Sequence, residues 1–578
     1  MGLTGALKAR ATLPAKVRKL PTSLRAAIGF NLIVTMALLP VAGQSYDLAG
    51  LTGNAGAWLR WGTPFFDHWK FGADLAALGV GAQGCAFILD HLGMGGAAAL
   101  TTAWKLPLVV ANIVTAVVLY DIARRLNSRR PTLVPLLWLL SPVPIFVAAG
   151  FGQVEPLTVL AFVLATDLVL RRRPIGSGVV IGLGIGFEYL PVLVLVAVVV
   201  AVSVRLLSKR EATYIGLAAL GTTAACFLPL LLTQTGRSGL FAGLGFSAVA
   251  ASAIHNSVGA PRSSSLWLLL GGISPGRYWV IAGAVLCLGI AVALVFYGRR
   301  RGGEIERQRC FVAVSAAMLL VVVLADPGTL PQFSDLVFGS LCLLSLVIIV
   351  PAWSLILGPF LQLLVGIVWV YGGTFESFWY DMWATTGNAG WQLPQSATLA
   401  TWLGIAGVVA IIIGLVVAIV PPGLGLHITR RMPLLALSIA CAGSLFFAVW
   451  SAQPAYWAGV GPNGPSVLPM FRSVTALGSL PGPQHPTVHL STGFPQDPTI
   501  AGPSLNSWLS VPVNKRTGST ALVLMGLAYV ALIVGGGSLA GAWVLSGVEN
   551  IDDRLGMEAD ADGEHPSRRP GPEPARRG

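Results

Sequence analysis

The stretch LLSPVPIFVAAGFGQVEPLTVLAFVLATDLVLRRRP, residues 139–174, decides the fold class. Apolar residues fill it on both sides of a short polar segment that contains Gln153 and Glu155, and three arginines follow the second apolar run. A helix needs about 20 apolar residues to cross a membrane, and the runs 132–149 and 156–170 approach that length. The stretch therefore predicts two membrane helices joined by a tight polar turn.

The rest of the chain repeats this pattern. Hydrophobic residues make up 54% of the sequence and charged residues only 11%, whereas a soluble domain has about 25% charged residues. Residues 173–205 predict a broken hairpin whose kink is Glu188-Tyr189-Leu190-Pro191. We expect an all-α integral membrane protein, a polytopic bundle of about 12–14 transmembrane segments with extracytoplasmic loops and interfacial helices. The other predicted spans are 26–43, 99–120, 213–232, 278–297, 311–325, 335–350, 352–371, 399–420, 433–451 and 519–546.

Basic residues indicate the orientation of these helices. With the N-terminus in the cytoplasm, 28 of the 37 Lys and Arg residues fall in short cytoplasmic segments, as the positive-inside rule requires. The same asymmetry explains the net charge of +13 without a nucleic-acid partner. Only seven of the basic residues are Lys, a bias that favours a bacterial source. We therefore predict a multi-pass protein of a bacterial plasma membrane with cytoplasmic N- and C-termini.

The chain divides into four parts on this reading. The predicted parts are a basic cytoplasmic N-terminus (1–25), a catalytic transmembrane core (26–350) with outer loop 44–97, a C-terminal transmembrane region (351–546) with outer loops 372–398 and 452–518, and a disordered cytoplasmic tail (547–578).

Acidic residues favour chemistry on the outer face. Ten lie on that side of the predicted topology: Asp47, Asp67, Asp74, Asp90, Glu155, Asp326, Asp335, Glu376, Asp381 and Asp497. Asp47 closely follows the first helix, where a carboxylate is well placed as general base for a lipid-borne substrate or simply ends the helix in water. Asp67 and His68 form a second polar cluster in the same loop.

Polar residues inside the apolar stretches are further candidates. Gln153 and Glu155 could point into a cavity beside Asp47, or could form a turn that is merely polar. Glu188 at the hairpin kink must find a partner or be protonated, and Lys105 is the nearest basic candidate, although it could also reach the outer interface. The six Cys residues and the scattered acids show no metal-ligand spacing, so we predict no metal site and no cofactor, and metal dependence stays open.

Three segments in order carry a family resemblance. They read WKLPLVVANIVTAVVLYDIARRL (104–126), the stretch 139–174 quoted above, and GSGVVIGLGIGFEYLPVLVLV (176–196). Together they resemble polytopic glycosyltransferases of the GT-C fold, particularly bacterial polyprenyl-phosphate-mannose-dependent mannosyltransferases. The residues in matching places are Lys105, Pro107, Pro142, Gly152, Gln153, Gly178, Gly182 and Pro191.

The resemblance implies inverting transfer of one sugar from a polyprenyl-phosphate donor to a cell-envelope glycan or glycolipid on the extracytoplasmic face. The sugar it favours is mannose. Asp47 corresponds to the general base and Glu155 to a second acid. Three positions depart from the family pattern: Glu155 stands for an Asp, Asn112 for an acid, and Glu188 for a Lys. Phosphate binding then falls to Lys105, Lys70 or Arg262. The implied substrate-binding residues are Gln153, Lys105, Asp67, His68, Lys70, Glu188 and Tyr189.

Two other functions fit the same residues. A transporter or flippase of a lipid-linked saccharide would explain Glu188 and the many helices. A catalytically silent GT-C-like scaffold could bind envelope proteins through the Pro-rich loop 452–518, which would also serve an active enzyme as a docking surface. Membrane lipids are partners in every case.

Overall fold

A computed structural model describes most of the chain between residues 20 and 419. The described ranges are 20–39, 71–93, 96–128, 131–232, 278–301, 303–326, 333–348, 352–371 and 394–419, with residues 237, 266, 269 and 350. Helices account for the secondary structure in these ranges, and no strand occurs among them. The predicted N-terminal segment (1–19), loop residues 372–393, loop 452–518, the spans 433–451 and 519–546 and the tail 547–578 lie outside the described residues.

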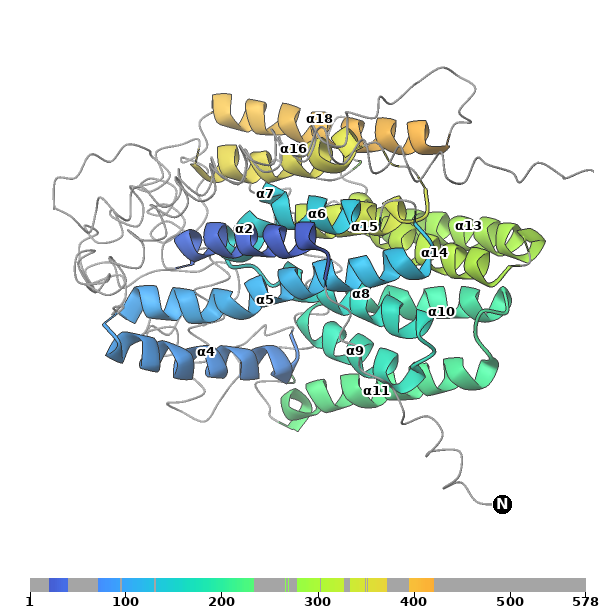
Figure 1. Cartoon of the computed structure of the whole chain (residues 1–578), viewed down its shortest axis with the longest axis horizontal. Coiled ribbons are helices and arrows are strands. Elements are labelled where there is room, and N and C mark those ends of the chain that lie inside the picture. Colours follow the sequence, from blue (N-terminus) through green and yellow to red (C-terminus); the bar gives the residue numbers. More distant parts are fainter. Residues whose placement is uncertain are drawn as a thin grey trace, which may run out of the picture.

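The helices form one elongated bundle (Figure 1). Most of them run along its long axis, with α16 and α18 on one side and α9 and α11 on the other. Between these pairs lie α5, α8, α14 and α15. Their bounds are α2 Thr22–Leu38, α4 Ala73–His91, α5 Gly96–Arg125, α6 Leu133–Leu140, α7 Pro142–Ile145, η1 Phe146–Phe151, α8 Glu155–Leu170, α9 Pro174–Phe187, η2 Leu190–Val192, α10 Leu193–Ser203, α11 Lys209–Leu232, α13 Tyr278–Arg301, α14 Glu304–Ala325, α15 Ser334–Ser345, α16 Ala352–Tyr371 and α18 Pro394–Ile419.

The all-α membrane fold predicted from the sequence is confirmed. Within the described ranges, four helices are long and apolar enough to cross a membrane, namely α4, Thr102–Arg125 of α5, α11 and α14. A fifth span results if the bent pair Leu133–Leu140 and Pro142–Gly150 is counted as one. Shorter apolar helices surround them. The chain is therefore a multi-pass membrane protein, while the total of 12–14 segments stays a prediction.

The predicted helix 132–149 is broken in the structure. It bends by 45° at Ser141, whose backbone is extended and whose Oγ accepts a hydrogen bond from the Val143 amide. Pro142 has no amide hydrogen and disfavours a helical conformation in the residue before it, which explains the break. Asn31 of α2 donates a hydrogen bond of 2.8 Å to the Leu139 carbonyl beside the break. An amide from another helix thus binds a carbonyl next to the bend, as membrane helices require.

The predicted outer loop 44–97 contains a helix that the sequence analysis missed. α4 has 19 residues, rich in Ala, Gly and Leu, and it packs beside α5 (Figure 1). Gly79, Gly81 and Gly84 interrupt its apolar pattern, and Asp74 and Asp90 lie near its ends. These features made the segment look like an interfacial stretch, although its length and composition suffice for a membrane span.

The hairpin predicted over 173–205 is present. α9 ends at Phe187, η2 follows, and α10 returns along the bundle. Both hairpin ends lie near the start of α14, because Arg172 pairs with Glu304 at 3.8 Å and Arg307 donates to the Arg205 carbonyl at 3.4 Å. The kink is therefore at the opposite end of the bundle from the arginines.

The arginines gather at one end of the bundle. Arg125 of α5 lies 3.0 Å from Asp121 and 3.5 Å from Asp167 of α8. Arg171 pairs with the same two carboxylates, with 2.6 Å between its Nε and Asp167 Oδ2. Arg309 of α14 donates a hydrogen bond of 3.0 Å to the Leu126 carbonyl. We call these contacts, together with the ion pairs of Arg172 with Glu211 of α11 and with Glu304 of α14, the arginine end; it joins α5, α8, α11 and α14.

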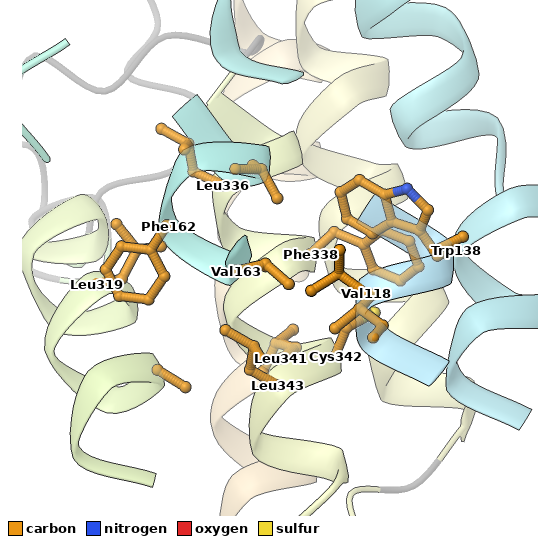
Figure 2. Packing of buried hydrophobic residues seen from close by; sticks show 14 of the residues in the cluster. Val118, Trp138, Phe162, Val163, Leu319, Leu336, Phe338, Leu341, Cys342 and Leu343 are labelled. Carbon is orange, nitrogen blue, oxygen red and sulfur yellow. The ribbon is translucent and has the colours of Figure 1, made fainter. Parts of the chain in front are cut away.

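An apolar core lies between the arginine end and the kink. Trp138 of α6 stacks on Phe338 of α15 with 5.5 Å between ring centroids. Figure 2 shows Phe162 of α8 next to Leu319 of α14. Residues of α15, such as Phe338, lie between this pair and Trp138. This core fixes the positions of α5, α6, α8 and α15 relative to one another.

Candidate active site

The turn between η1 and α8 lies against α5. The π-helix η1 ends at Phe151, and the next residue, Gly152, has a φ of +69°, the left-handed conformation that favours glycine. The Gly152 carbonyl accepts a hydrogen bond of 2.8 Å from Trp104 Nε1. A Cβ added to Gly152 would lie 3.2 Å from Lys105 Cε and 3.3 Å from Lys105 Cγ. Two consecutive residues of α5 thus contact Gly152: Trp104 binds its carbonyl, and Lys105 packs against its Cα.

Three polar side chains are buried at this turn. The exposed fraction of Lys105 is 0%, that of Gln153 is 5% and that of Glu155 is 2%. Glu155 is the first residue of α8 and Pro156 the second, a position where a carboxylate interacts favourably with the helix dipole. Burying an amine and a carboxyl group inside a membrane protein is costly, so such groups usually mark a functional site.

The turn lies far from the arginine end. Lys105 precedes Arg125 by 20 residues on α5, which corresponds to about 30 Å along the helix axis. Glu155 and Asp167 likewise lie near opposite ends of α8. Because the hydrocarbon core of a membrane is about 30 Å thick, the two charged groups lie near its opposite boundaries.

The kink of the α9–α10 hairpin lies at the same end as the turn. A Cβ added to Gly184 of α9 would lie 2.7 Å from the Ala161 Cβ of α8 and 2.8 Å from Pro191 Cγ. Glu188 follows Gly184 by one helical turn, so it reaches the level of the first turn of α8, which begins with Glu155. The neighbouring Tyr189 ring stacks on Phe227 of α11, with 6.4 Å between centroids. Glu188 and Tyr189 are half-buried.

The first predicted loop also reaches this kink. The Gly72 amide donates a hydrogen bond of 2.7 Å to the Gly186 carbonyl at the end of α9. The Asp74 carboxylate at the start of α4 contacts the Gly186 backbone. The start of α4 therefore brings Asp74, one of the acids predicted to lie on the outer face, close to Gly186, which precedes Glu188 by two residues.

Some of the predicted site residues lie outside the part of the chain that the structure describes. Asp47, Asp67, His68, Lys70 and Arg262 lie outside the described residues, so their predicted roles stay predictions. Within the described part of the chain, no three His, Cys, Asp or Glu side chains are grouped closely enough to hold a metal ion.

The sequence analysis missed two residues of this region. Trp104 was treated only as part of a family motif, yet its indole holds the Gly152 carbonyl. Asp74 was grouped with the outer acids but not chosen, although it contacts the hairpin end. A Trp-Lys pair inside an apolar helix was the available signal for Trp104, because buried indole nitrogens usually need a partner. No local signal connects Asp74 with Gly186.

Part of the chain is similar to a known protein family. Residues 88–327 match the family model of glycosyltransferase family 87. This match indicates a glycosyltransferase. The region matching glycosyltransferase family 87 contains Lys105, Gln153, Glu155, Glu188 and Tyr189, and it runs from the end of α4 to the end of α14. None of the curated proteins matches the chain.

The glycosyltransferase match confirms the resemblance to polytopic GT-C glycosyltransferases found in the sequence. It covers the turn, the kink and the arginine end, but not α2, α15, α16 or α18. The roles of individual site residues in a glycosyltransferase reaction stay predictions.

Proposed function

We propose that this protein transfers a sugar from a polyprenyl-phosphate donor to a glycan or glycolipid of the cell envelope, and that this sugar is mannose. The observation that carries this proposal is the buried group of Lys105, Gln153 and Glu155, at the bundle end opposite the arginines and inside the region that matches glycosyltransferase family 87. A lipid-linked donor suits this position because its phosphate lies at the membrane boundary.

The positive-inside rule supports an extracytoplasmic reaction. The arginine end contains basic residues from several segments, and such residues are retained on the cytoplasmic side of a bacterial membrane. The turn with Glu155 then faces the extracytoplasmic side. Both termini are cytoplasmic in this topology.

The proposed reaction is an inverting displacement. Asp47 accepts the proton of an acceptor hydroxyl while that oxygen forms a bond to the anomeric carbon. The bond between the anomeric carbon and the phosphate oxygen breaks, and polyprenyl phosphate leaves with its electron pair. Lys105 stabilises the phosphate charge that develops, as a fixed cation does in a site shielded from water.

The remaining residues bind the two substrates. Gln153 and Glu155 hydrogen-bond to sugar hydroxyls beside Lys105. Glu188 and Tyr189 at the kink line the donor side, with Asp67, His68 and Lys70 of the first loop on the acceptor side. Envelope proteins bind through loop 452–518.

Transfer from radiolabelled polyprenyl-phosphate-mannose tests this proposal. Membranes carrying the wild type should form a labelled product, and membranes with Asp47→Asn at matched protein levels should lose it by a factor of about 100 or more. Product that survives Asp47→Asn would assign the base to another residue. A donor panel that yields no product with the wild type, together with movement of lipid-linked sugar across vesicles, would establish the flippase instead.

A further inference from the structure

A buried acid at the start of α15 lies outside the region that matches the glycosyltransferase family. Asp335 has an exposed fraction of 0%, and neither of its carboxylate oxygens has a hydrogen-bond partner among the described residues. An ionisable group buried in this way in a membrane protein is costly to keep. The apolar core alone therefore does not explain Asp335.

The helix face that carries Asp335 is directed toward α6 and α5. Residues 335, 338 and 342 lie on one face of α15, since they are three and seven positions apart. Phe338 stacks on Trp138, and Trp138 Nε1 donates a hydrogen bond of 3.0 Å to the Asn112 carbonyl of α5. In Figure 2, Cys342 on this face points toward Val118 of α5.

Contacts between α15 and α8 place Asp335 at the level of Glu155. A Cβ added to Gly339 would lie 2.9 Å from Val159 Cγ1. α14 starts at the arginine end, and α15 begins within nine residues of the end of α14, so α15 runs back in the same direction as α8. Asp335 precedes Gly339 by one turn, just as Glu155 precedes Val159.

Other polar atoms of α5, α8 and α15 share the property of Asp335. Within the described ranges, Asn112 Oδ1, Thr158 Oγ1 and Ser334 Oγ are buried and have no hydrogen-bond partner. Buried polar atoms are normally satisfied by protein, water or ligand, so each exception needs an explanation. They come from α5, α8 and α15, which are the helices around Glu155.

We propose that Asp335 binds hydroxyl groups of the sugar carried by the lipid donor. An ionised carboxylate only accepts hydrogen bonds, and adjacent sugar hydroxyls can donate to both of its oxygens. The polyprenyl phosphate without sugar has no such hydroxyls. This inference rests on the proposed glycosyltransferase function and adds a sugar-binding residue from α15 to the site.

Equilibrium binding of two lipids to the full-length protein in lipid nanodiscs tests the inference. Asp335→Asn should weaken binding of polyprenyl-phosphate-mannose about tenfold, through loss of charge-assisted hydrogen bonds, and leave binding of polyprenyl phosphate unchanged. Asp335→Ser provides a second variant if the first folds poorly. Asp167→Asn is the matched control, because it removes the charge of a buried carboxylate at the arginine end and should not change the preference for the sugar-bearing lipid.

The outcomes are distinguishable. If correctly folded Asp335 variants bind both lipids equally more weakly, or bind both as the wild type does, Asp335 does not bind the sugar. The proposed function still stands in that case if the wild type binds the sugar-bearing lipid more tightly than polyprenyl phosphate. If the wild type binds every sugar-bearing lipid of a donor panel no more tightly than the lipid phosphate without sugar, both the role of Asp335 and the proposed function are overturned.

Discussion

At the scale of single residues, the conformation of Gly152 controls how the polar turn lies on α5. Gly152→Val forces a left-handed backbone on a branched residue and brings its Cβ to about 3.2 Å from Lys105 Cε. We expect this variant to lose roughly 1–2 kcal/mol of stability from the backbone alone and to lower transfer activity. The measurement is the melting temperature of the purified protein together with transfer rate.

Gly216→Ala provides the control for that substitution. Gly216 lies inside α11, and a Cβ added there meets no atom within 4 Å. Alanine in place of glycine inside a helix stabilises by roughly 0.5–1 kcal/mol, so this variant should melt at or slightly above the wild-type temperature. An unchanged melting temperature and activity in Gly152→Val would contradict the role assigned to the turn.

The sequence predicted some residues of the site and not their neighbours. Gln153 and Glu155 were identifiable because a polar pair between two apolar runs has little room to leave the membrane boundary. The contact of Lys105 with Gly152 joins residues 47 positions apart and depends on how η1 ends. Such contacts are set by packing, which local patterns do not encode.

At the scale of elements, the crossing of α9 and α11 depends on glycine. A Cβ added to Gly182 would lie 2.5 Å from the Thr222 Cβ and 2.8 Å from the Ala219 carbonyl oxygen. We expect Gly182→Leu to separate the helices and to destabilise the protein by roughly 1–3 kcal/mol, because small residues allow membrane helices to pack closely. Thermal unfolding in detergent measures this loss.

Gly176→Ala is the matched control on the same helix. A Cβ at Gly176 meets only the Leu168 methyl groups, at 3.7 Å and 3.9 Å, which is ordinary contact. The free energy of unfolding of this variant should stay within about 0.5 kcal/mol of the wild-type value, so its melting temperature should change little. If Gly182→Leu and Gly176→Ala have the same melting temperature, the close packing of α9 against α11 does not contribute to stability as described.

The direction of the elements gives another prediction. Arg173 at the start of α9 and His91 at the end of α4 are exposed at opposite ends of the bundle. A membrane-impermeant maleimide should label His91→Cys in intact cells and Arg173→Cys only after permeabilisation, since the proposed topology places the arginine end in the cytoplasm. Unsubstituted protein reports labelling of its own cysteines. The reverse pattern would contradict the proposed orientation.

Helix prediction from the sequence succeeded where apolar runs were continuous. The span 352–371 coincides with α16, and 156–170 differs from α8 by one residue. It was wrong at Ser141, where two prolines and two asparagine side chains from other helices stabilise a bend. It also missed α4, because glycines and polar ends weaken the apolar pattern of that helix.

At the scale of the whole molecule, two charged groups define the ends of an apolar bundle. The arginine end joins α5, α8, α11 and α14 through ion pairs such as Arg172 with Glu211. The other end gathers buried polar residues from α5, α8 and α15 around the turn at Glu155. In the proposed function, the arginine end sets the orientation in the membrane and the other end binds the substrate at the membrane boundary.

The most direct test compares sugar transfer by Glu155→Gln and Asp167→Asn, two buried carboxylates near opposite ends of α8. The account predicts that Glu155→Gln lowers product formation from the lipid-linked sugar about tenfold or more at matched folded protein, through loss of charge-assisted hydrogen bonds to the sugar, whereas Asp167→Asn retains product in proportion to the protein that folds. Equal transfer by the two variants per folded molecule would contradict the central claim that the polar turn is the site of reaction.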